Sequence, residues 1–234
     1  MDAETVMNSA GNERHIITRV PAGALRSGLL KWWGKGKRYF PWGETRDPYR
    51  ILVAEILLHR TRAEQVGPLY TRFLGLFPDV ETLAHSTPEE LVELFYSGGL
   101  RWRWKLLHSM AVTLEERFKG KIPEDYSTLI SLPGVSHYIA SAVRCFAFGH
   151  PDVILDTNTV RVVGRLFGLP VTDSSRRSRL FRAVLEELID VEQPREFNFA
   201  LIDFAALICK SKTPLHEQCH LNQYCCFYNA NVPC

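Results

Sequence analysis

Potential metal ligands of the soft type lie close together near the C-terminal end of this 234-residue chain. Cys209, His216, Cys219 and Cys225 follow one another with the spacing C-x6-H-x2-C-x5-C. Thiolates and imidazoles at such short intervals are typical of a bound metal ion or an iron–sulfur cluster, because one loop must fold back until all of them face the same centre. A Cys3His zinc site is an alternative for the same four residues. The sequence therefore predicts a metal-bound loop at 209–225.

The composition agrees with a metal site better than with disulfides. Hydrophobic residues make up 46% of the chain and charged residues 23%, as in ordinary globular proteins. We see no signal peptide at the N-terminus and no apolar run long enough to span a bilayer, so we expect no membrane association. Without a secretion signal, six cysteines indicate metal binding more than a disulfide framework.

The charge distribution is compatible with a nucleic-acid partner. The formal net charge is only +2, but basic residues gather in the segments 31–38, 101–105 and 176–182. Local basic patches on a nearly neutral protein suit the binding of backbone phosphates. A solvated surface is the alternative explanation for any single patch.

Apolar residues recur at intervals of three and four along most of the chain, which predicts an all-α fold. Alternating runs long enough to build a β-sheet are missing from the sequence. The predicted helices are 51–58, 88–96, 106–118, 138–148 and 180–189. Glycine and proline mark the breaks between them, at 98–99, 119–121, 132–134 and 168–170.

The segment 132–138 reads Leu-Pro-Gly-Val-Ser-His-Tyr and lies between two predicted helices. A tight turn between helices exposes backbone N–H groups at the N-terminus of the second helix, where the helix dipole favours an anion such as a DNA phosphate. Gly134 suits the turn, whereas Ser136 stands where a second glycine would be the least strained residue. Taken alone, the segment is equally consistent with an ordinary connection between helices.

Asp156 directly follows the apolar run 153–155 and precedes another helical stretch. An aspartate in that place is often only the N-cap of a helix. Here, however, it follows the Leu-Pro-Gly turn, begins the string D-T-N-T-V-R-V and precedes the cysteine loop. This order resembles that of the helix-hairpin-helix DNA glycosylases, the superfamily of endonuclease III and the adenine glycosylase MutY. The resemblance extends from Phe40 to Cys225.

The resemblance implies two helical lobes. Residues 48–150 would form a six-helix lobe that contains the hairpin, and residues 1–47 and 151–234 would form the second lobe with the loop 209–225. In the superfamily this loop carries cysteine at all four positions and binds a [4Fe-4S] cluster, so His216 is a departure. We expect a [4Fe-4S] cluster held by Cys209, His216, Cys219 and Cys225, with zinc as the alternative.

The resemblance also assigns the catalytic residues. The aspartate that matches Asp156 stabilises the oxocarbenium-like sugar or orients the attacking water, and Asn158 would position that carboxylate. Glu55 matches the acid that contacts the extruded base. Tyr138 stands where bifunctional members carry a lysine that forms a Schiff base, so the expected enzyme is monofunctional.

Several residues would contact double-stranded DNA. His59 and Arg60 replace glutamines that fill the vacated base stack in MutY, and Leu100 matches the apolar wedge. Backbone phosphates would be contacted by residues of the hairpin and of the metal loop, namely Gly134, Ser136, His137, Lys210 and Lys212.

The choice of base depends on the branch of the superfamily. The strings R-D-P-Y at 46–49 and E-I-L-L-H-R-T at 55–61 are similar to the archaeal T/G-mismatch (Mig-type) glycosylases, which implies removal of thymine or uracil opposite guanine. MutY carries a further C-terminal domain, and we expect none after Cys234. The alternatives are an adenine glycosylase, a glycosylase for an unusual base, and a structure-specific DNA-binding protein without catalysis. We expect a monomer in the cytoplasm of a prokaryote.

Overall fold

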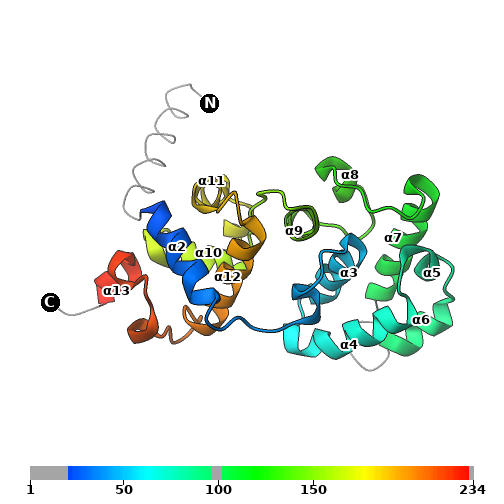
Figure 1. The fold of residues 1–234 in the computed structure, drawn as a ribbon, viewed down its shortest axis with the longest axis horizontal. Helices are drawn as coiled ribbons and strands as arrows, with labels where there is room; N and C mark the ends of the chain where they lie inside the picture. Colours follow the sequence, from blue (N-terminus) through cyan, green and yellow to red (C-terminus); the bar gives the residue numbers. More distant parts are fainter. Residues whose placement is uncertain (1–20, 96–101, 232–234) are drawn as a thin grey trace, which may run out of the picture. The chain divides into compact units, whose positions relative to one another are not determined.

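A computed structural model describes residues 21–95 and 102–231 (Figure 1). Within these ranges the chain forms α-helices and short 3-10 helices without any β-strand, which confirms the predicted all-α class. No helix in the same ranges combines the length and the apolar character needed to cross a membrane. The chain divides into two compact units: one spans Tyr39–His150, and the other combines the described residues up to Arg38 with those from Pro151 onward.

The unit Tyr39–His150 is built around a helix that is buried almost along its whole length. It contains η1 (Pro41–Gly43), α3 (Pro48–Leu58), α4 (Ala63–Leu76), α5 (Val80–Ala84), α6 (Pro88–Phe95), α7 (Arg103–Phe118), α8 (Tyr126–Ile130) and α9 (His137–Phe148). Helix α3 packs against α4, α7 and α9. The Asp47 side chain caps α3 by accepting a hydrogen bond from the Arg50 N–H, and Pro48 fits the first turn.

The predicted hairpin is formed by α8 and α9. Gly134 lies in the turn with φ +80, and a Cβ atom there would lie 3.1 Å from the Leu106 Cβ. Ser136 has the extended conformation of an N-cap (φ −88), and its hydroxyl accepts a hydrogen bond from the Ile139 N–H at 3.3 Å. The turn therefore needs glycine at position 134, whereas serine at position 136 is unstrained and caps α9.

The other unit surrounds α10 (Thr157–Phe167). It also contains α2 (Ala22–Trp33), η2 (Ser175–Arg177), α11 (Arg179–Leu188), α12 (Pro194–Leu207), η3 (His216–Gln218), η4 (Asn222–Tyr224) and α13 (Cys226–Asn231). Helix α10 packs against α11, α12 and α13, and α2 packs against α11 and α12. Gly168 ends α10 in the left-handed conformation, with φ +69.

Candidate active site

The carboxylate of Asp156 is held at the first turn of α10 by three hydrogen bonds. Its Oδ1 accepts from the backbone N–H groups of Asn158 and Thr159, at 2.8 and 2.7 Å. Its Oδ2 accepts from the side-chain Nδ2 of Asn158 at 2.8 Å. Asp156 is therefore the N-cap of α10, and its carboxylate occupies donors of the first helical turn that would otherwise have no partner. The side chain is half-buried, so the charge lies at the protein surface without being fully solvated.

Arg161 connects this aspartate to the start of the cysteine loop. One of its guanidinium nitrogens, Nη1, donates to Asn158 Oδ1 at 3.1 Å. Nε donates to the carbonyl of Cys209 at 3.0 Å, and Nη2 donates to that of Ala205 at 2.9 Å. Burial lowers the pKa of Arg161 below its usual value. The guanidinium thereby fixes both the Asn158 amide and the end of α12.

A second arginine, one turn later on α10, holds the next residues of the loop. Arg165 donates to the carbonyls of Lys210 and Ser211, both at 2.7 Å. It also donates to Cys209 Sγ at 3.5 Å. The side chains of Lys210 and Lys212 are exposed. The backbone of the loop is thus bound to α10, while its lysines remain accessible to an anion.

Cys209 and Cys225 are buried in the cysteine loop, and Cys219 is half-buried. Burial raises the pKa of Cys219 to about 11, with smaller effects from Cys225 and Cys209. Burial likewise raises the pKa of Cys225. His216 lies against aromatic rings of α13, with 5.0 Å between its ring centroid and that of Tyr228. Within the described ranges no group of three or more His, Cys, Asp or Glu residues is arranged to hold a metal ion. The four-ligand set therefore stays a prediction.

The hairpin residues and Glu55 belong to the unit Tyr39–His150. His137 is exposed at the start of α9, and its Nδ1 is hydrogen-bonded to the Tyr126 hydroxyl at 3.0 Å. Tyr138 is half-buried on the same helix. Glu55 is only 4% exposed and lies among the apolar residues of α3. A buried carboxylate in apolar surroundings is costly unless it has a function or a partner.

The turn that follows α3 presents His59 and Arg60 to solvent. Arg60 adopts the left-handed conformation, with φ +59. Burial, followed by the charges of Arg103 and Arg60, lowers the pKa of His59. The sequence suggested that Arg103 belongs to an exposed basic patch, and this is wrong: it is 2% exposed, because its guanidinium bonds to the turn after α3. Leu100, the predicted wedge, lies outside the described residues.

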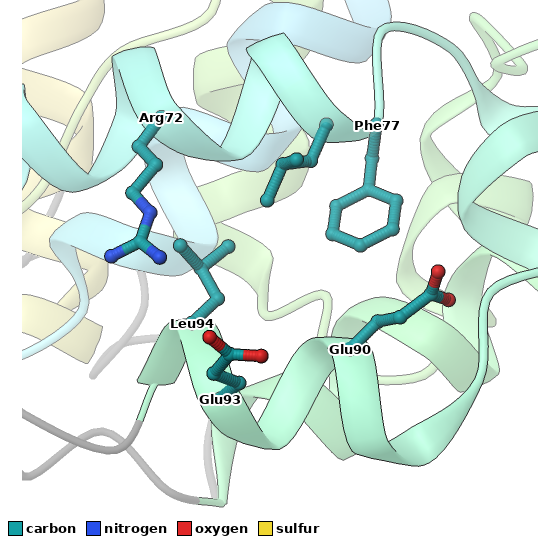
Figure 2. Close-up of a pocket in the computed structure, with 6 residues that line it drawn as sticks. Arg72, Phe77, Glu90, Glu93 and Leu94 are labelled. Carbon is teal, nitrogen blue, oxygen red and sulfur yellow. The ribbon is translucent and has the colours of Figure 1, made fainter.

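A cleft of about 240 Å³ lies elsewhere in the same unit, between α4 and α6. Figure 2 shows Arg72 on one side of it and Glu90 and Glu93 on the other. The cleft is also lined by Leu76, Phe77 and Leu94, and by none of the residues that the sequence assigned to catalysis or DNA binding. We therefore do not include it in the candidate site.

Comparison with known proteins identifies a similar fold and similar sequences. The fold matches the solved structure of a thermostable thymine-DNA glycosylase with a TM-score of 0.82 and 32% identity, covering 89% of this chain and 97% of that one. Thymine-DNA glycosylase of Aeropyrum pernix is 38% identical over 214 residues, which are 88% of this chain and 95% of the relative. Adenine DNA glycosylase of Buchnera aphidicola is 30% identical over 204 residues, 87% of this chain but only 58% of the relative.

These matches define a helix-hairpin-helix repair protein. The family model described as "HhH-GPD superfamily base excision DNA repair protein" matches residues 53–187, which include the hairpin and Asp156. The chain belongs to the HhH-GPD superfamily.

Proposed function

We propose that the protein is a monofunctional DNA glycosylase that hydrolyses the N-glycosidic bond of thymine or uracil opposite guanine. Two of the proteins compared above are named thymine-DNA glycosylases, and this chain covers 95% and 97% of their lengths. The adenine glycosylase relative has a large part that this chain does not match, since the coverage of that protein is 58%. The observation that carries the proposal is the hydrogen-bonded carboxylate of Asp156 at the N-terminus of α10.

In this mechanism Asp156 faces the sugar of an extruded nucleotide. As the base departs, positive charge develops on the sugar, and the carboxylate stabilises it or orients the attacking water. Asn158 holds the carboxylate through its side-chain amide. Glu55 contacts the extruded base from α3 and supplies a proton to it. Tyr138 has no amine, so the sugar forms no Schiff base and the strand stays intact until alkali is added.

We further propose how the protein holds DNA. The N–H groups of the hairpin at Gly134, Ser136 and His137 bind a backbone phosphate, which suits the N-terminus of α9. Lys210 and Lys212, which lie in the cysteine loop, bind further phosphates of the DNA backbone. His59 and Arg60 fill the space that the extruded base leaves, and Leu100 acts as the wedge. The partner is double-stranded DNA with a mismatched or damaged base, bound by a monomer in the cytoplasm of a prokaryote.

We propose that Cys209, Cys219, Cys225 and His216 hold a [4Fe-4S] cluster. The chemistry of the donors suits such a group, because Cys209, Cys219 and Cys225 form no disulfide and thiolates are the usual ligands of iron–sulfur clusters. A bound cluster would supply cross-links that stabilise the loop. Arg161 and Arg165 already attach this loop to α10 through the carbonyls of residues 209–211, so its order matters for the lysines that it presents.

Two adjacent cysteines provide a matched test of this ligand set. Cys225→Ser should remove most of the bound iron and acid-labile sulfide, because it replaces a thiolate ligand with a weakly binding hydroxyl. Cys226→Ser should keep both at the wild-type level, since Cys226 begins α13 and lies beside Gly168. Iron, sulfide and zinc analysis of the purified proteins makes the comparison. Equal iron in both variants would reject Cys225 as a ligand, and zinc without sulfide would identify a Cys3His zinc site.

Base excision under single-turnover conditions tests the function. Labelled duplexes carry T/G, U/G, A/G, A/8-oxoguanine or an oxidised pyrimidine, and each reaction is analysed with and without alkali. We expect breaks at T/G and U/G that depend on alkali. Activity confined to adenine pairs would instead identify an adenine glycosylase. Strand breaks without alkali would disprove the monofunctional mechanism. Absence of product on every duplex would contradict the proposed activity and favour a DNA-binding protein without catalysis.

A further inference from the structure

The turn after α3 has a backbone conformation that its sequence does not favour. Arg60 lies in the left-handed region, with φ +59, although it is not glycine. For most residues this conformation costs about 1 kcal/mol or more, so neighbouring contacts must hold it in place. His59 and Arg60 are both exposed. The turn therefore exposes the polar side chains of His59 and Arg60, and the backbone of Arg60 is strained.

Arg103, at the start of α7, supplies those contacts. Its Nη1 donates to the carbonyl of Leu57 at 2.9 Å and to the Thr61 hydroxyl at 2.8 Å. Its Nη2 donates to the carbonyl of His59. One planar guanidinium thus bridges both sides of Arg60, which a lysine ammonium cannot reproduce in the same geometry.

The guanidinium loses water contacts on burial, and one of its donors stays without a hydrogen-bond partner in the described structure. Arg103 is 2% exposed, and this donor is its Nε. Desolvation lowers the pKa of Arg103. A buried arginine that donates to the carbonyls of a surface turn serves the shape of that turn more than overall stability.

The residue before Arg103 completes the contact. Trp102 is 47% exposed, and its ring meets that of His59 edge-on at 6.1 Å between centroids. The Arg103 guanidinium lies 5.3 Å from the centre of the Trp102 ring. Both the backbone and the ring of His59 are therefore held from the start of α7.

We propose that Arg103 is a positioning residue for base extrusion: it holds the turn so that His59 and Arg60 are ready to fill the space left by the extruded base. This inference rests on the proposed function of that turn. Arg103 itself does not touch DNA in this role; it acts through the two exposed side chains.

A double-mutant cycle tests the proposal. In the wild-type background, Arg103→Lys should lower the excision rate on the T/G duplex by about 10-fold or more, because the turn relaxes. In a His59→Ala/Arg60→Ala background the same substitution should change the rate by less than about 2-fold, since the side chains that it positions are gone. Within each background, Arg103→Lys should change the affinity for undamaged duplex by less than about 2-fold, because Arg103 itself does not contact DNA and phosphate contacts elsewhere dominate the affinity. An equal loss in both backgrounds would overturn the proposal.

A second pair of variants covers the case in which Arg103→Lys does not fold. Thr61→Val removes the hydroxyl that accepts from Arg103, whereas Thr61→Ser keeps it. Thr61→Val should lower the excision rate, whereas Thr61→Ser should keep most of the wild-type rate. The two variants should have the same thermal unfolding temperature. Equal rates in the two variants would reject the positioning role.

Fluorescence of 2-aminopurine placed beside the mismatch reports base extrusion independently of bond cleavage. If wild-type protein excises no base, the proposed function fails. The effect of Arg103→Lys on the fluorescence still decides the role of Arg103: a smaller extrusion signal supports it, and an unchanged signal refutes it.

Discussion

Replacing Asp156 with asparagine is expected to lower the single-turnover rate of base excision by about 100- to 1,000-fold, while affinity for mismatched duplex changes little. Asparagine is nearly isosteric and as good an N-cap as aspartate, so α10 should still begin at Thr157. What it lacks is the negative charge that, in the proposed mechanism, stabilises the positive charge developing on the sugar. Excision kinetics and duplex binding, measured on the same preparation, separate these effects.

Asp79→Asn is the matched control for this experiment. Asp79 caps α5 by accepting from the Thr82 N–H at 2.8 Å, and no role in the site is assigned to it. The control should excise at the wild-type rate. If Asp156→Asn also excised at that rate, Asp156 would be only a helix cap, and the catalytic carboxylate would have to be sought elsewhere.

Replacing Gly164 with alanine should destabilise the protein by about 1–3 kcal/mol. Gly164 lies inside α10, where alanine is normally the better helix former. Its added Cβ atom would, however, lie 2.3 Å from Val171 Cγ2 and 3.0 Å from the carbonyl oxygen of Leu169. The chain that follows α10 would have to move away. Chemical denaturation followed by circular dichroism measures the change.

Gly23→Ala provides the opposite case in the same unit. Gly23 lies in α2, and a Cβ atom there would meet nothing within 4 Å. The substitution should therefore stabilise the protein, by up to about 0.5 kcal/mol, because Gly23 lies in the first turn of α2, where the helix preference of alanine has less than its full effect. If Gly164→Ala stabilised the protein as Gly23→Ala does, the loop 169–171 would be able to move away from α10 without loss of stability. That result would contradict the close packing of this loop against Gly164.

Local features of this protein were predictable from its sequence because their causes are local. Helix periods, breaks and caps depend on residues within one or two turns, and the predicted helix 106–118 corresponds to α7, Arg103–Phe118. The sequence is consistent with Asp156 as either a helix cap or a functional carboxylate. The structure shows that it is a cap, and the family match includes its position. Its catalytic role stays a prediction.

The residues that support the site were not predictable, because their partners are distant in the chain. Arg103 bonds to Leu57, 46 residues earlier, and Arg161 bonds to Cys209, 48 residues later. In the sequence, Arg103 alternates with tryptophans like any surface cation. Only the packing of α7 against α3 turns its guanidinium inward.

The three hydrogen bonds of Asp156 also determine when the conformational entropy of its side chain is lost. A carboxylate without these donors would rotate freely in the folded protein. Here the donors from Asn158 and Thr159 restrict it already in the folded chain. The loss of side-chain entropy therefore belongs to folding, and the contact with DNA proposed for Asp156 does not add it to the cost of binding.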